Sequence, residues 1–101
     1  MAVNFKIEFD RIANELTRLF QDEIKRQGLV DTGKLLNSVK WTVRETSNGW
    51  DLQMEALDYF QYLDDRYSIS KNVFASAQYE RVQTQIADTY NLYIIEQLNF
   101  E

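Results

Sequence analysis

Residues 39–56 read VKWTVRETSNGWDLQMEA, and this stretch decides the fold of the chain. Apolar and polar side chains alternate on both sides of Asn48-Gly49. An Asn-Gly pair between two alternating runs is the strongest short-range signal for a β-hairpin. We therefore predict that Val39–Thr46 and Trp50–Ala56 are antiparallel strands joined by a turn at Asn48 and Gly49.

This turn sets a register in which the apolar side chains of both strands share one face. The predicted pairs on that face are Trp41 with Ala56, Val43 with Met54, and Ser47 with Trp50. The predicted pairs on the polar face are Thr42 with Glu55, Arg44 with Gln53, and Thr46 with Asp51. The predicted buried residues are Trp41, Val43, Trp50, Leu52 and Met54. A two-stranded ribbon is only marginally stable by itself, so helices must cover it, or a third strand or a neighbouring chain must extend it.

Helical periodicity flanks the hairpin on both sides. Apolar residues recur three and four positions apart from Asn4 to Gln27, and Gly28 is suited to end that helix in a left-handed cap. A second helix is predicted from about Ala77 to Leu98, with the apolar stripe Val82, Ile86, Tyr90, Tyr93, Ile94 and Leu98. The expected fold is a single α+β domain over residues 1–101. It has a long N-terminal helix, a short turn, the hairpin, possible extension by a further strand, and a C-terminal helix packed on the sheet.

The composition excludes most catalytic chemistry. The 101 residues include no cysteine and no histidine, which removes the thiolate nucleophile, sulfur-ligated metals and the usual general base near neutral pH. Acidic residues interrupt the apolar N-terminal stretch, which argues against a signal peptide, and no apolar run reaches the length of a membrane span. We therefore expect a protein that is not an enzyme and that holds no cofactor and no metal.

The net charge of −5 is unevenly distributed. Residues 1–50 hold eight lysines and arginines against seven acids (+1), and residues 51–101 hold three against nine (−6). An acidic chain disfavours nucleic-acid binding. Either the two halves meet head to tail between copies, or the acidic half is only solvated. In the first case the facing cations are expected to come from Arg11, Arg18, Lys25, Arg26, Lys40 and Arg44.

Residues 28–35 match two catalytic patterns that their context rejects. The first is the phosphate-binding loop, in which Leu35 occupies the place of the magnesium-binding hydroxyl. The second is the Asp-Thr-Gly tripeptide of aspartic proteases, which are rich in strands and glycine. A structural interpretation suits residues 31–38 better. Asp31 or Thr32 caps a short helix, Gly33 allows a tight turn, Leu35 enters the core, and Ser38 ends the turn.

The segment Asp58–Tyr67 is dense in aromatic residues and is expected to be a short helix or an irregular connection. We predict a subunit interface at its aromatic residues Tyr59, Phe60, Tyr62 and Tyr67. The alternative is that they belong to the core of the chain. The carboxylates of Asp58, Asp64 and Asp65 are interpreted as solvated charge rather than as a metal site.

The stretch from Val30 to Val39 resembles the most recognisable motif of the gene-product-ten-like family of tailed phages. This family comprises tail-component or tail-completion proteins, which sit where the tail meets the head. The matching residues are Asp31, Thr32, Gly33, Leu35, Ser38 and Val39. Asp58–Leu63 looks like the tyrosine-rich segment of the family, and Asn72–Ala77 is similar to its approach to the last helix.

The resemblance implies a non-enzymatic structural subunit of the virion, assembled in the host cytoplasm. It implies a ring at the neck or head-proximal tail end, of six copies in preference to twelve, which performs tail completion or head–tail joining. The implied partners are further copies of the chain and neighbouring neck or tail-tube proteins, with DNA only in transit and no membrane. The alternative function is an acidic phage-borne inhibitor or DNA mimic that blocks a nucleic-acid-binding protein.

Overall fold

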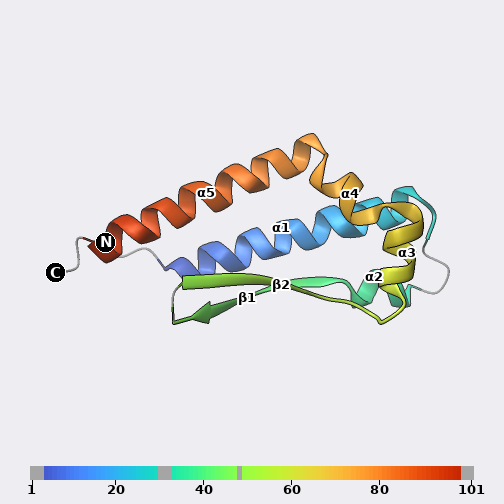
Figure 1. Cartoon of the computed structure of the whole chain (residues 1–101), viewed down its shortest axis with the longest axis horizontal. Coiled ribbons are helices and arrows are strands. Elements are labelled where there is room, and N and C mark those ends of the chain that lie inside the picture. Colours follow the sequence, from blue (N-terminus) through green and yellow to red (C-terminus); the bar gives the residue numbers. More distant parts are fainter. Residues whose placement is uncertain (1–3, 30–32, 48, 99–101) are drawn as a thin grey trace.

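The computed structural model describes residues 4–29, 33–47 and 49–98 of the chain. Its elements, in chain order, are α1 (Phe5–Arg26), α2 (Lys34–Ser38), β1 (Lys40–Thr46), β2 (Gly49–Glu55), α3 (Phe60–Tyr67), α4 (Ile69–Phe74) and α5 (Ala77–Leu98). The hairpin packs along one side of α1 and α5 along another, while α2, α3 and α4 gather at the end of α1 where α5 begins (Figure 1). The predicted α+β class and the order of helix, hairpin and helix are confirmed.

Local signals at both ends of α1 explain its length. The side-chain oxygen of Asn4 accepts a hydrogen bond from the backbone N–H of Ile7 (3.2 Å), which caps the first turn. At the other end Gly28 has a φ of +73°. The N–H groups of Gly28 and Leu29 donate to the carbonyl oxygens of Lys25 and Ile24, which is a Schellman motif. The predicted helix and its glycine stop are both confirmed.

The hairpin forms, but in a different register from the predicted one. Its paired residues are Lys40 with Glu55, Trp41 with Met54, Thr42 with Gln53, Val43 with Leu52, Arg44 with Asp51, Glu45 with Trp50, and Thr46 with Gly49. The predicted pairing of Trp41 with Ala56 and Val43 with Met54 was therefore wrong by two residues. The ladder continues to Gly49, so the two residues between its last pair are Ser47 and Asn48; Asn48 lies outside the described residues. A shift of two residues keeps every side chain on its predicted face.

Packing against α5 explains why residue 49 is glycine. Gly49 is buried and has a φ of +151°. A Cβ atom built on it would overlap the hydroxyl group of Tyr90 and would lie 3.2 Å from the ring carbon that carries this hydroxyl. The glycine is therefore needed for the close approach of α5 to β2, in addition to its conformational freedom.

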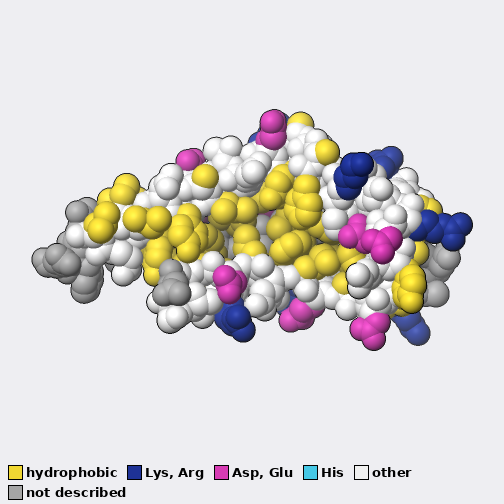
Figure 2. All heavy atoms as spheres, viewed as in Figure 1, with side chains coloured by type: hydrophobic (Ala, Val, Ile, Leu, Met, Phe, Trp, Pro, Cys, Tyr) yellow, Lys and Arg dark blue, Asp and Glu magenta, His cyan; other side chains and the backbone are white. Residues whose placement is uncertain are grey.

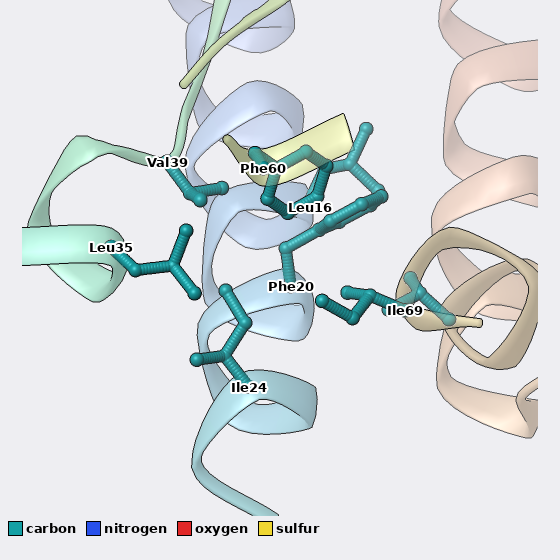
Figure 3. Close-up of a cluster of buried hydrophobic side chains, with 8 residues drawn as sticks. Leu16, Phe20, Ile24, Leu35, Val39, Phe60 and Ile69 are labelled. Atoms are coloured by element: carbon teal, nitrogen blue, oxygen red, sulfur yellow. The ribbon is translucent and has the colours of Figure 1, made fainter. Parts of the chain in front are cut away.

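Two apolar clusters along α1 make up the core. The first contains Leu16, Phe20, Ile24, Leu35, Val39, Phe60, Ile69 and Val73 (Figure 3). The second contains Phe9, Ile12 and Val82. The five hairpin residues predicted to face inward are half-buried and pack against these clusters: Trp41 and Met54 on the first, and Val43, Trp50 and Leu52 on the second. The predicted inward face of the hairpin is thus confirmed.

A helix that the sequence reasoning did not predict, α4, connects α3 to α5. Ser68, with a φ of +56°, separates α3 from α4. The carboxylate of Asp64 accepts hydrogen bonds from the backbone N–H and from the hydroxyl of Ser70, both at 2.6 Å. The first of these bonds gives a partner to the Ser70 N–H, which has none within the first turn of α4. Two apolar side chains of this helix, Ile69 and Val73, belong to the first cluster.

The last helix, α5, has the predicted bounds, but its apolar stripe is only partly covered. Val82 is buried, and Ile86, Tyr90 and Tyr93 are half-buried. Farther along, the side chains of Leu92, Ile94, Ile95 and Leu98 are exposed. None of the described helices is long and apolar enough to cross a membrane.

Candidate functional site

The motif that carries the family resemblance begins with two residues, Asp31 and Thr32, that lie outside the described residues. The N-cap of α2 is Gly33, which has a left-handed backbone and makes no side-chain cap. Its carbonyl oxygen accepts the hydrogen bond of the Asn37 N–H at 2.9 Å. The prediction that Asp31 or Thr32 is the N-cap was therefore wrong, because the N-cap position is Gly33 and the five-residue helix begins at Lys34. Gly33 itself has a φ of +73°, a backbone conformation that favours glycine.

The other motif residues join α1, α2 and the hairpin. Leu35 and Val39 are buried in the first cluster, where Leu35 points toward Ile24 (Figure 3). The Ser38 hydroxyl donates to the carbonyl oxygen of Leu35 (2.8 Å) and accepts from the backbone N–H of Leu57 (3.2 Å). Because Leu57 follows β2, Ser38 holds the open end of the hairpin together. In the described residues the motif acts as a structural joint.

The structure separates the four residues of the predicted aromatic interface. Phe60 is 4% exposed and belongs to the first cluster, so it is not available to a neighbouring subunit. Its assignment to the interface was wrong, because α3 uses Phe60 to pack on α1. Tyr67 is half-buried against the same cluster. Tyr59 and Tyr62 remain exposed, at 43% and 80%.

The exposed tyrosines mark a surface that we call the tyrosine patch, consisting of Asp58, Tyr59, Gln61, Tyr62 and Asp65. Four of these residues, all except Tyr59, line a shallow hollow. The patch belongs to the α3 end of the molecule, away from the C-terminal end of α5 (Figure 1). An exposed aromatic side chain beside carboxylates suits a contact with a partially basic protein surface.

The acidic residues of this segment have distinct surroundings. Asp64 caps α4, as described above, whereas Asp58 and Asp65 are exposed in the tyrosine patch. Within the described part of the chain, no group of three or more acidic residues is arranged to hold a metal ion.

A strong electrostatic interaction surrounds Glu23, a residue that the sequence reasoning did not single out. Its carboxylate accepts hydrogen bonds from Arg26 (2.6 and 2.8 Å), Gln27 (2.6 Å) and Asn72 (2.9 Å). The Arg26 hydrogen bond is the main reason that the pKa of Glu23 falls from 4.5 to about 2, although burial acts in the opposite direction. Since Asn72 belongs to α4, this carboxylate ties α4 to α1. The spacing of Glu23 and Arg26 signals an ion pair, but nothing in the sequence signals the contact with Asn72.

The cations expected to face a neighbouring subunit are mostly paired within the chain. Arg11 lies 3.6 Å from Glu8, Arg18 3.6 Å from Glu15, Arg26 2.6 Å from Glu23, and Arg44 3.7 Å from Asp51. The pairs made by Arg11, Arg18 and Arg44 are exposed on both sides and contribute little to stability. They do reduce the positive charge that the N-terminal half offers to the acidic half of another copy.

Comparison of the chain with protein-family models, with curated proteins and with solved structures finds no match.

Proposed function

We propose that this chain is a non-enzymatic structural subunit of a bacteriophage virion, which forms a ring at the neck or at the head-proximal end of the tail. The observation that carries the proposal is the exposure of Tyr62 and Tyr59 on a short helix whose opposite face is fixed in the core by Phe60. A rigid platform that holds aromatic side chains in water is typical of a protein–protein contact.

The motif from Gly33 to Val39 supports the family part of the proposal. Its residues form the joint between the N-terminal helix and the hairpin, which is the setting that the motif has in the tail-completion family it resembles. Ser38 and Leu35 have structural contacts there and need no substrate.

The charge of the chain fits a position around passing DNA. With a net charge of −5, a ring of such subunits has an acidic surface to present to its lumen. Acidic walls repel phosphates, so DNA passes without being held.

The tyrosine patch is tested by changing both exposed tyrosines. We expect Tyr59→Ser/Tyr62→Ser to abolish assembly while the circular-dichroism spectrum stays unchanged, because neither side chain is in the core. Gln61→Ser, on the same exposed surface, is the matched control and should assemble normally. Light scattering coupled to size exclusion measures the masses. Normal assembly of the double variant would show that the patch is not a subunit contact.

The virion assignment needs a separate measurement. Mass spectrometry of purified particles from a phage that encodes the chain should detect it at a fixed ratio to the tail-tube protein. Its absence from mature particles would contradict the structural role and favour the inhibitor alternative.

A further inference from the structure

One exposed face of α5, turned about 120° from the face that packs on α1 and called the outer face below, has two different halves. The half between Ala77 and Ala87 is mostly polar, and a shallow hollow lies there beside its small side chains, lined by Ala77, Glu80, Arg81, Gln83, Thr84 and Ala87. The half beyond Asn91 carries Ile94, Ile95 and Leu98, which are 45%, 52% and 72% exposed. Hydrophobic side chains gather over this C-terminal part of α5 in the space-filling view (Figure 2).

The residues of this outer face have the spacing of a helix–helix seam. Thr84, Ala87, Asn91, Ile94 and Leu98 follow one another at intervals of three, four, three and four residues, which is the a/d pattern of a coiled coil. Val82, Ile86 and Tyr90 lie about 120° away around the helix, where they pack in the second cluster. Thr84–Leu98 contains two charged residues, Asp88 and Glu96, and neither occupies a seam position.

We propose that this face binds a second copy of the chain, with the two α5 helices antiparallel and crossing at Asn91. This arrangement places Ile94 and Leu98 of each copy on the small side chains Ala87 and Thr84 of the other. A parallel pair would instead oppose large residues to large ones and leave the two hollows facing each other. The contact is isologous, since the same surface serves both copies.

Polar groups at the seam favour the same register. The antiparallel crossing brings the Asn91 amides of the two copies together, and a single asparagine in an apolar seam specifies alignment at some cost in stability. Arg81 makes no ion pair among the described residues. In the antiparallel pair it lies near the C-terminal end of the other helix, where the carbonyl groups carry partial negative charge.

The size of the seam sets the strength of the pair. Fifteen residues from Thr84 to Leu98 span about 22 Å of helix, and a helix is about 10 Å wide. The contact area on each helix is therefore about 220 Å², which is less than the ~800 Å² per partner of a standard interface, so the pair dissociates on dilution.

The seam and the tyrosine patch are separate surfaces, so both contacts form at once. When each copy in a ring of six pairs through α5 with a further copy, the assembly contains twelve copies.

The absence of cysteine from the chain permits a direct test by disulfide cross-linking. Under mild oxidation, Asn91→Cys should form a covalent dimer, because the two-fold axis passes through this position. Thr84→Cys alone should not, since its two copies lie about 20 Å apart along an antiparallel pair. An equal mixture of Thr84→Cys and Leu98→Cys should give the mixed dimer. Gln85→Cys, exposed but away from the seam, is the matched control.

Several outcomes would overturn the proposal. Dimers of Thr84→Cys with itself would indicate a parallel pair. Equal yields from Asn91→Cys and Gln85→Cys would indicate random collision, and no dimer at all would show that this face is unpaired. As a second measurement, the Ile94→Lys/Leu98→Lys variant should dimerise at least tenfold more weakly than the wild type in sedimentation equilibrium. Asn91→Cys should still cross-link in the Tyr59→Ser/Tyr62→Ser background, so the pair and the ring contact are tested separately.

Discussion

At the scale of single residues, Glu23 has a strongly lowered pKa, and this makes the stability of the chain depend on pH. The pKa of its carboxyl falls to about 2 in the folded chain, from 4.5. The corresponding stabilisation is complete above about pH 4.5 and is lost as the pH falls toward 2, because the unfolded chain then binds the proton more readily.

We expect the wild type to lose about 1–2 kcal/mol more unfolding free energy between pH 5 and pH 2 than Glu23→Gln does. Glu15→Gln is the matched control, since Glu15 has only an exposed arginine 3.6 Å away. Urea denaturation at a series of pH values measures the difference. Parallel pH profiles for the wild type and Glu23→Gln would refute the role of this carboxylate.

The contact between Gly49 and Tyr90 leads to a second prediction at this scale. Gly49→Ala forces a methyl group against the Tyr90 hydroxyl, and it should lower the unfolding free energy by about 1–3 kcal/mol. In the Tyr90→Phe background the same change should cost less, because the overlapping oxygen is gone. A double-mutant cycle measured by urea denaturation gives the coupling. Strict additivity would mean that the glycine serves only its backbone conformation.

At the scale of elements, α4 depends on a cap supplied by α3. Asp64→Ala removes both hydrogen bonds to Ser70, and we expect it to cost about 1 kcal/mol, the usual effect of losing a helix cap. Asp65→Ala, one residue on and exposed, should change stability little. Chemical denaturation of the two variants makes the comparison. Equal stabilities would show that the Asp64 cap does not stabilise α4.

The hairpin and the connecting helices show how far sequence patterns reach. Alternation identifies the faces of Trp41 and Met54, but registers that differ by two residues have the same faces, so alternation does not choose between them. The observed register brings Gly49 against Tyr90, a contact between residues far apart in the sequence that alternation does not reveal. The helix α4 is too short to show periodicity, and its cap comes from Asp64 in the preceding helix. The long helices α1 and α5 were predicted closely because each repeats its apolar period over many turns.

The candidate site was predictable only in part, for a related reason. Aromatic density indicates that residues 59–67 are important for packing, but it does not separate the buried Phe60 from the exposed Tyr62. That separation follows from the helical phase of α3 on α1. In the same way, the half-chain charge balance does not reveal that Arg11, Arg18 and Arg44 are already paired within the chain.

As a whole, the molecule is an elongated body of 53 × 25 × 21 Å. The tyrosine patch lies at the α3 end, and the apolar C-terminal part of α5 lies at the other end (Figure 1). In the proposed assembly, both ends of this elongated molecule contact other copies of the chain. Closure of a ring requires that the tyrosine patch meet a different surface on the next copy.

The most direct test of the ring is native mass spectrometry of the wild-type protein over a range of concentrations. The proposal predicts a closed species of six subunits, which is 6 × 12.0 kDa or about 72 kDa, with a doubled species of twelve where the α5 helices pair. A mass of 12.0 kDa at every concentration, or a continuous ladder of masses without a closed species, would contradict it.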